Sequence, residues 1–504
     1  MKPGSLKTFL LIIIIILGCY GTAVSSEEIH LTVNEAVSLA LENNLNLKLQ
    51  KNEVAIGQSV KLIEEGAFDS LFEAGVSSQE QRMTSLLSGG EENEKSTLWN
   101  AAIKKKLATG TELGILWENE LVETDSTIVA LDELYNSAFS FSITQPLLRG
   151  NSKAIQTAGI RAAEKNTQAA MYQVDEQAAN LAAQVKNAYW DLVLARQDIE
   201  VKKLSLKLAR NLRDETSKKI KSGVLAAVEI FQPDSEIARR EEFLITAERD
   251  IANAEDNLKL LINSREWQVV LIPGDLPEIK EERPDLEAVL ANVLTNRPDI
   301  RASDLLVESA EIRKSKAADD LKPSLAVNGT AGMRGDGDNY SDSVDDSFSD
   351  PQFSWQVGLT FQIPLGNRTS KGSLARARAE LMSARHRAEL LRQEVTRNAR
   401  EAVRNVNLAL KTIEATRKTS LASQKRLEAE QAKFEVGLAT ANDVLEFQDS
   451  YAQALISEKR ALIDLAKARA ELDRAQGIVR LRDEVAEPAV SDSIKTELFA
   501  SGEF

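Results

Sequence analysis

One segment near residue 360 alternates regularly between apolar and polar side chains. From Gln352 to Ile363 every odd position is apolar, and every even position is polar or glycine. A period of two is typical of a β-strand with one apolar face and one polar face. Shorter stretches at 71–76, 139–144 and 324–328 show the same alternation. The pattern therefore predicts at least four strands, two in each half of the chain.

The first half contains a further candidate hairpin for which the second half has no counterpart. Its predicted strands are Leu98–Leu107 and Thr111–Trp117, with a turn at Thr109-Gly110. Glycine favours such a turn because it adopts backbone angles that other residues avoid. With this hairpin the chain has four to six strands, and the pattern leaves open whether 98–117 joins the others.

The other predicted elements are helices, and they occur in the same order in both halves. Their approximate ranges pair as 32–65 with 284–320, 152–221 with 368–435, and two last helices that end near 263 and 477. A helix of about 65 residues would be roughly 100 Å long at 1.5 Å per residue. Coiled coils and helical tubes use such lengths, whereas compact domains do not.

The two halves also align residue by residue. Lys221–Asn263 aligns without a gap with Glu435–Gly477, which brings Gly223 opposite Gly437. Such a long period indicates a duplicated structural unit. We predict two structural repeats, 28–265 and 282–480, with a linker at 266–281 and a C-terminal tail at 481–504.

Residues 1–26 are typical of an export signal. Lys2 and Lys7 precede the apolar run Phe9–Leu17, which is too short to span a bilayer. Two cleavage readings remain open. Either Cys19 becomes the acylated first residue of a lipoprotein, or an ordinary signal peptidase cuts after Ala23-Val24-Ser25. Both readings take the mature protein out of a bacterial cytoplasm.

Composition excludes several classes of protein. The net charge of −15 provides no basic footprint for nucleic acid. Cys19 is the one cysteine, and the two histidines, His30 and His386, are far apart, so we expect no metal site. We found no catalytic motif such as G-x-S-x-G or a phosphate loop, and we expect neither an enzyme nor a cofactor.

The apolar strand faces need a partner, and two are conceivable. One is the core of a soluble sheet, which is the better reading of any single strand. The other is lipid, which we favour because the neighbouring helices are too long to fold back over a small sheet. Open strand edges are not tolerated in lipid, and the smallest bacterial barrels have about eight strands. Several chains must therefore share one barrel, by default with closed cyclic symmetry.

Several short segments follow one another in a characteristic order: Leu31–Asn44, Gln145–Gly150, Arg297–Ile300, Ile363–Gly366 and Gly437–Glu446. Together they resemble the TolC-type outer-membrane efflux proteins over about residues 28–480. The resemblance implies a mixed α and β membrane protein and a homotrimer. In it, about four strands per chain form a β-barrel in outer-membrane lipid, which a long α-helical coiled-coil tunnel continues across the periplasm. It also implies a periplasmic adaptor (membrane fusion) protein and an inner-membrane pump as partners of a passive, gated conduit.

The resemblance also assigns residues to a periplasmic gate. Gly223 and Gly437 fall at inter-helix turns, where the family has the inner end of its tunnel. Glu229 and Asp443 fall where the family has constricting aspartates, with Glu446 at the place of a further acid. Phe434 stands where some members have a tyrosine that locks the closed state, a hydrogen bond that phenylalanine cannot make.

These gate residues also have simpler readings. Acidic residues at a helix start can cap it or favour its dipole, and the glycines can be ordinary turn residues. Rings of carboxylates in a symmetric assembly would attract cations. For the whole chain, the alternative is an exported coiled-coil protein without a pore, which does not explain the alternating strands. Drug efflux and protein secretion both remain open, and Arg297-Pro298-Asp299 leans toward efflux.

Overall fold

The computed structural model describes residues 28–84, 91–124, 133–279 and 281–479. The predicted signal with Cys19 and the tail at 481–504 lie outside these residues. The chain divides into two compact units, each built from separate stretches of sequence. The helical unit comprises the described parts of 1–48, 177–295 and 396–480, and the sheet unit those of 49–176 and 296–395. No described helix is long and apolar enough to cross a membrane.

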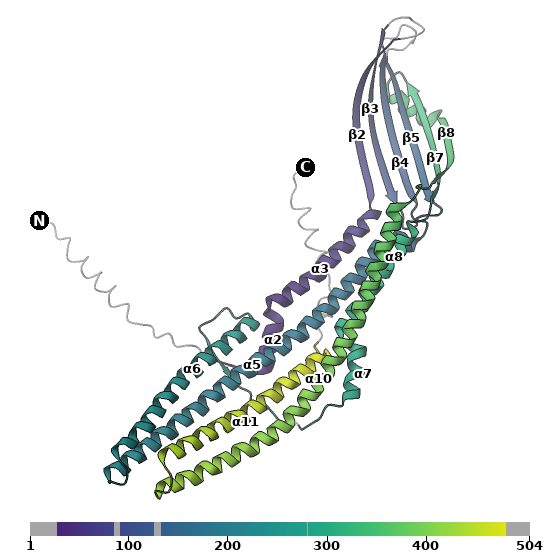
Figure 1. Ribbon diagram of the computed structural model, residues 1–504. Helices are drawn as coiled ribbons and strands as arrows, with labels where there is room; N and C mark the ends of the chain where they lie inside the picture. Colours follow the sequence, from purple (N-terminus) through teal and green to yellow (C-terminus); the bar gives the residue numbers. More distant parts are fainter. Residues whose placement is uncertain (1–27, 85–90, 125–132, 280, 480–504) are drawn as a thin grey trace, which may run out of the picture. The chain divides into compact units, whose positions relative to one another are not determined.

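The sheet unit contains one antiparallel sheet of six strands, which lie side by side in Figure 1. In spatial order the strands are β2 (Ser70–Thr84), β3 (Glu91–Lys106), β4 (Glu112–Thr124), β5 (Glu133–Pro146), β7 (Ser324–Gly337) and β8 (Gln352–Gln362). Each strand pairs with its neighbour along nearly its whole length. Four strands therefore come from the first half of the chain and two from the second.

The candidate hairpin at 98–117 is part of this sheet, which therefore has six strands in the described residues, whereas the family resemblance implies about four. Lys106 pairs with Glu112 at the turn, and the Leu107 amide donates to the Thr111 carbonyl at 2.8 Å. Gly110 has a φ of 87°, a conformation that favours glycine. The prediction placed the turn correctly but made both strands too short.

The register places apolar residues on one face of the sheet, called here the apolar face. Its members include Phe72, Val76, Trp99, Ile103, Ile115, Trp117, Phe139, Phe141, Ile143, Phe353, Trp355, Val357, Leu359 and Phe361. On β8 these side chains are exposed, Trp355 to 71%. The opposite face, called the polar face, includes Glu73, Asn100, Lys104, Glu112, Ser140, Ser142, Thr144, Thr330, Gln356 and Thr360.

Helices of the sheet unit precede and follow the strands. They are most of α3 (Leu45–Glu65), the 3₁₀ turn η2 (Gly66–Phe68), α4 (Lys153–Gln156), α8 (Pro298–Asp319), α9 (Tyr340–Ser349) and the N-terminal parts of α5 (Ala158–Lys221) and α10 (Arg368–Glu435). The aspartate-rich segment 335–350 contains the end of a strand and a helix. The strand β7 continues to Gly337, and Asn339 caps α9 by accepting the Asp342 amide at 3.0 Å.

The helical unit contains the C-terminal parts of α5 and α10 together with several further elements. These are β1 (Glu28–Leu31), α2 (Val33–Asn43), the 3₁₀ turn η3 (Ala227–Ile230), α6 (Phe231–Ile262), β6 (Val270–Pro273), α7 (Leu286–Asn296) and α11 (Ala441–Gln476). The predicted linker at 266–281 contains β6, which pairs in parallel with β1. The buried hydroxyl of Tyr189 accepts the Asp275 amide and donates to the Leu31 carbonyl, both at 3.0 Å, and so holds this pair to α5.

Two of the predicted helices are broken in the structure. The segment 32–65 divides at Asn44, whose Oδ1 accepts the amides of Asn46 and Leu47 and so starts a second helix. The Asn44 Nδ2 donates to the Leu261 carbonyl at 2.9 Å. The segment 284–320 divides before Pro298, which has no amide proton to continue α7. The helix ends predicted near 263 and 477 are correct, with Asn263 and Gly477 in left-handed caps.

Candidate functional site

Two helical hairpins of the helical unit carry the residues that the sequence assigned to a gate. In Figure 1, α5 with α6 forms one hairpin and α10 with α11 forms the other. Gly223 (φ 77°) and Gly437 (φ 81°) lie in the two turns, where an added Cβ atom would meet no heavy atom within 4 Å. Both turns thus need glycine for its backbone angle and leave open space around it.

The acids Glu229 and Asp443 follow these turns in different settings. Glu229 lies exposed in η3, with no side-chain cap at that turn. Asp443 forms a capping box with Thr440, whose amide and hydroxyl donate to its carboxylate at 2.9 and 2.7 Å. These bonds, first that of the Thr440 amide, hold the pKa of Asp443 below its ordinary value. Asp443 therefore has the capping role that its place at a helix start allows.

Glu446 lies one turn further along α11 and is exposed. It borders a polar hollow of about 570 Å³ between α10 and α11, together with Asp449. The rest of the lining is mainly hydroxyl side chains, contributed by Thr416, Thr419, Ser423, Ser450 and Ser457. A surface of this kind suits water and hydrated ions more than apolar ligands.

Phe434 is buried, with 2% of its surface exposed. It packs in a core cluster with Leu212, Leu427, Ala441, Val444 and Leu445. The Lys219 ammonium from the other hairpin lies 4.0 Å from the centre of its ring and donates to its carbonyl oxygen. Phe434 therefore joins the hairpins by packing and a cation–π contact, where a tyrosine lock would use a hydroxyl.

Sequence reasoning missed a buried polar network between the hairpins, which centres on Arg240 of α6. Its side chain is 3% exposed, and its guanidinium donates to Glu236, to the Ser205 carbonyl, and across to Gln448 and Asp449 of α11 at 2.6–2.9 Å. Arg239 also donates to Asp449, at 2.6 Å. Arg240 and Asp449 are 209 residues apart in sequence, so no local pattern could have paired them.

Glu236 balances this charge from within α6. Burial raises its pKa, but hydrogen bonds from Arg239 and Arg240 outweigh that effect, and the net shift is downward. Because the guanidinium of Arg240 has acceptors on three helices, it fixes the spacing of α5, α6 and α11.

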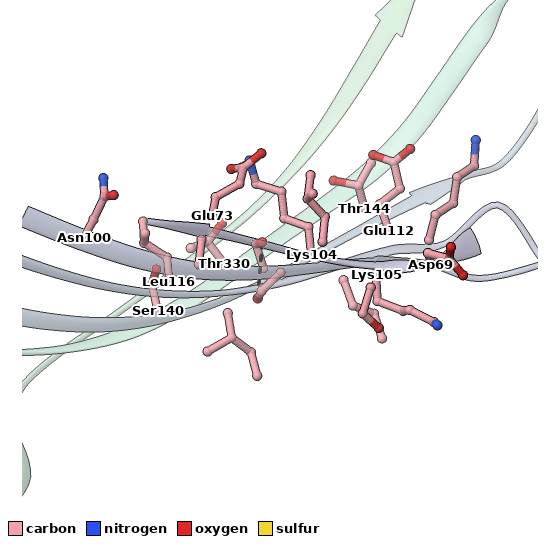
Figure 2. A pocket seen from close by; sticks show the side chains of 18 of the residues that line it. Asp69, Glu73, Asn100, Lys104, Lys105, Glu112, Leu116, Ser140, Thr144 and Thr330 are labelled. Carbon is pink, nitrogen blue, oxygen red and sulfur yellow. Dashed lines mark hydrogen bonds and ion pairs between the residues drawn. The ribbon is translucent and has the colours of Figure 1, made fainter. Parts of the chain in front are cut away.

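The polar face of the sheet is hollowed in the sheet unit. A hollow of about 840 Å³ lies over β2 to β5, and Figure 2 shows its polar and charged side chains. Glu73 of β2 and Lys104 of β3 form an ion pair at 2.5 Å there. Ser140, Thr144 and Thr330 extend the polar lining to β5 and β7. The sheet thus has one wettable, hollowed face and one exposed apolar face.

Within the described residues, no cluster of three or more His, Cys, Asp or Glu side chains could hold a metal ion. The buried pair of Arg297 and Asp299, at 2.9 Å, belongs to the start of α8 in the sheet unit. It is therefore a local feature of that helix and adds no residue to the hairpins described above.

Comparison with known proteins agrees with this geometry. Residues 289–478 match the family model described as outer membrane efflux protein. No curated protein matches the sequence. Among solved structures, a membrane protein from Pseudomonas aeruginosa has a TM-score of 0.68 at 17% identity, covering 88% of this chain and 93% of its own.

Two outer membrane channels also have this fold. The Campylobacter jejuni CmeC outer membrane channel has a TM-score of 0.66 at 14% identity, covering 93% of this chain and 89% of its own. The open state of the Neisseria gonorrhoeae MtrE outer membrane channel has a TM-score of 0.61 at 20% identity, with 88% of each chain covered.

The fold, with its two-faced sheet and long helical hairpins, is that of the outer-membrane channels. The family match over residues 289–478 agrees with this fold and with the resemblance to the TolC-type outer membrane efflux proteins. Both findings support the expected function and location, those of an outer-membrane efflux channel. The reading as a coiled-coil protein without a pore is not supported.

Proposed function

We propose that three copies of this chain form one gated conduit, which an adaptor and an inner-membrane pump complete into an export system. The six-stranded sheet carries this proposal. In the described residues its outer strands, β2 and β8, each leave one edge without a partner, and its apolar face is exposed. An open edge beside an apolar face is stable in lipid only if another chain pairs with it.

The strand directions favour such closure. Successive strands alternate in direction across the sheet, so β8 of one chain would meet β2 of the next chain antiparallel. Three chains would then form a barrel of eighteen strands, beyond the twelve that four strands per chain would give. In this arrangement the apolar face meets lipid, and the polar face lines a water-filled lumen.

Crosslinking tests the barrel. We would place one cysteine at Gly75 of β2 and scan a second through Ser354, Gln356 and Gly358 of β8, all on the polar face. The expected result is a disulfide ladder of dimers and trimers at one register. In the matched control, the first cysteine is placed at Gly114 of the inner strand β4 instead of at Gly75. This control should form no disulfide between chains. Monomers at every register would contradict a shared barrel, and longer ladders would contradict three-fold closure.

We infer that the gate lies at the hairpin ends, as the two repeats 28–265 and 282–480 would place it. Exposed Glu229 and Glu446, with Asp443, would form rings of negative charge around the three-fold axis, while Phe434 holds the hairpins together from inside. The two repeats differ here. Gln232 replaces an acid at the position equivalent to Glu446, so the second repeat supplies more of the charge.

Such rings would make the conduit cation-selective. Replacing Glu229 and Glu446 with glutamine should shift the reversal potential in a salt gradient toward zero in planar bilayers. The matched control is Glu414→Gln, which removes an exposed acid already paired with Lys418 on the same helix. Equal selectivity in all three proteins would show that these acids do not line the path. A protein that conducts under no condition would end the conduit proposal itself.

The hairpin ends also have the surface that the adaptor would need. Their exposed apolar residues are Val224, Val228, Phe231, Val436 and Leu438, and Leu438 is exposed to 80%. Apolar side chains gathered at a turn mark a contact surface. Leu438→Asp should abolish copurification with the adaptor while leaving trimers intact. Asn442→Asp, also exposed near this end, is the control that should retain the adaptor.

A further inference from the structure

Helix α9 packs on the apolar face of the sheet and not on the polar face. Tyr340 contacts the ring of Trp99 at 5.6 Å, and Phe348 contacts that of Phe139 at 4.9 Å. Both partners are on the apolar face, where Trp99 belongs to the same row as Asn119, Ser137 and Gly335. The helix therefore lies on the side that the proposed barrel turns toward lipid.

Two glycines of β7 allow α9 to approach this closely. A side chain at Gly335 would overlap the Ser347 amide nitrogen and the Ser343 carbonyl oxygen. At Gly337 it would come within 2.5 Å of the Ser343 amide nitrogen. The hydroxyls of Ser343 and Ser347 bond to carbonyls of α9 itself, so these small, fully buried side chains need no other partner. Ser343 and Ser347 can therefore lie directly against the two glycines of β7.

Beneath α9 lie polar side chains whose exposure to hydrocarbon would cost free energy. Ser137 and Asn119 are both buried, and the Ser137 hydroxyl donates to the Asn119 amide oxygen at 2.8 Å. The indole of Trp117 donates to Ser137 at 3.3 Å. Without α9 this polar row would stand on the outer surface of the sheet, at the end where the lipid-facing band stops.

The apolar run on β8 indicates at which height in the proposed membrane α9 lies. Apolar residues run from Phe353 to Phe361, nine residues or about 30 Å of strand. A strand tilted by about 40° would span about 23 Å of membrane, close to the usual band of about 25 Å. The row under α9, which contains Ser137 and Gly335, lies just beyond the Phe353 end. The helix therefore falls at the boundary of the apolar band.

The outward side of α9 has the composition of a membrane interface. Tyr340 and Phe348 are partly exposed, Phe348 to 57%, next to the aromatic stack of Trp117 and Phe139. The aspartates 342, 345 and 350 are exposed as well. Aromatic rings concentrate at the level of lipid headgroups, whereas the carboxylates exclude the hydrocarbon interior.

We propose that α9 is an interfacial helix whose partner is the headgroup layer of the outer leaflet. It ends the lipid-facing band, shields the polar row of Asn119 and Ser137, and sets how deeply the sheet sits in the membrane. The inference rests on the proposed function in one respect, namely that the apolar face meets lipid.

Spin labels in vesicles of phosphatidylethanolamine and phosphatidylglycerol test this depth. Cysteines at Phe348 (α9), Val357 (apolar face) and Gln356 (polar face) would be labelled one at a time, and collisions with oxygen and with a water-soluble nickel chelate measured. Cys19 does not interfere, because both cleavage readings remove or acylate it. We expect Val357 to favour oxygen, Gln356 to favour nickel, and Phe348 to fall between them.

The outcomes separate the two proposals. A Phe348 label as nickel-accessible as that at Gln356, beside an oxygen-favouring Val357, overturns the interfacial helix and leaves the barrel intact. A Phe348 label as deep as that at Val357 also overturns it. A nickel-accessible Val357 overturns the barrel's lipid face and therefore the proposed function as well.

A second experiment tests the packing of α9. Gly335→Val should detach α9, which would make a Phe348 label mobile and fully nickel-accessible. Gly358→Val is the matched control, since a Cβ atom added to that glycine of β8 would have no heavy atom within 4 Å. Gly335→Ala is the milder variant if the valine blocks assembly. An unchanged label in both Gly335 variants would show that α9 is not held there and would overturn the inference.

Discussion

Replacing Arg240 with methionine should favour the open conduit by weakening the contact between α6 and α11. The substitution keeps an apolar stem but removes a buried guanidinium that donates to acceptors on three helices. Removing one member of a buried ionic network costs about 3–5 kcal/mol, because its partners lose their bonds. Because Glu236 and Asp449 both keep a hydrogen bond from Arg239, we take the lower end of this range.

Only part of this cost bears on the gate. Of the acceptors of Arg240, the side chains of Gln448 and Asp449 belong to α11, and the others belong to α5 and α6. About half of 3 kcal/mol, or about 1.5 kcal/mol, is then lost between the hairpins. Since about 1.4 kcal/mol is a factor of ten, the ratio of open to closed channels should rise about tenfold.

Single-channel recording in planar bilayers measures this ratio directly. The matched control is Arg249→Met on the same helix, because Arg249 is exposed and pairs with its neighbour Asp250. Its open fraction should equal that of the wild type. A trimeric Arg240→Met protein with an unchanged open fraction would refute the view that this network holds the hairpins together in the closed state.

Three other predictions follow from single contacts. Tyr189→Phe leaves the Asp275 amide and the Leu31 carbonyl without the buried hydroxyl, and should lower the stability of the helical unit by about 1–3 kcal/mol in denaturant melts. Acidification should release the start of α11. Because the pKa of Asp443 is lowered in the fold, its capping contribution is complete above its ordinary pKa and is lost as the pH falls through the lowered value. Hydrogen exchange at 440–446, corrected for intrinsic rates, would reveal this loss, and equal protection at all pH values would contradict it. Asn44→Ala should expose the α2–α3 junction to proteolysis, whereas Asn442→Ala at an exposed helix start should not.

Much of the fold could be predicted because its signals are local. Alternation from Gln352 to Ile363 fixed a strand and its two faces, and the left-handed caps at Asn263 and Gly477 marked two helix ends. The break at Asn44 was missed because its cap resembles an ordinary helical asparagine until the Leu261 carbonyl is seen beside it. The break at Asn44 thus depends on a contact with a residue far away in the sequence.

The candidate site was less predictable, for a related reason. Asp443 could be interpreted from its spacing to Thr440, a pattern within one helical turn. The Arg240 network and the packing of α9 depend on partners brought together by the fold, and the aspartates around α9 resemble a solvated loop in sequence. Gly335 and Gly337 were the available signal, since glycines in a strand often mark a close approach of backbone.

The order of the strands has a consequence for how channels of this kind can change size. The chain enters the sheet at Ser70 and leaves it at Pro146, then enters at Ser324 and leaves at Gln362, and the pairing places all four points at one end. Inserting a whole hairpin would therefore add two strands to the proposed barrel without reversing the direction of any other strand or changing the end at which the helices join the sheet. The diameter of the proposed barrel could thus evolve in steps of one hairpin per chain, with no change in the helical hairpins of the proposed gate.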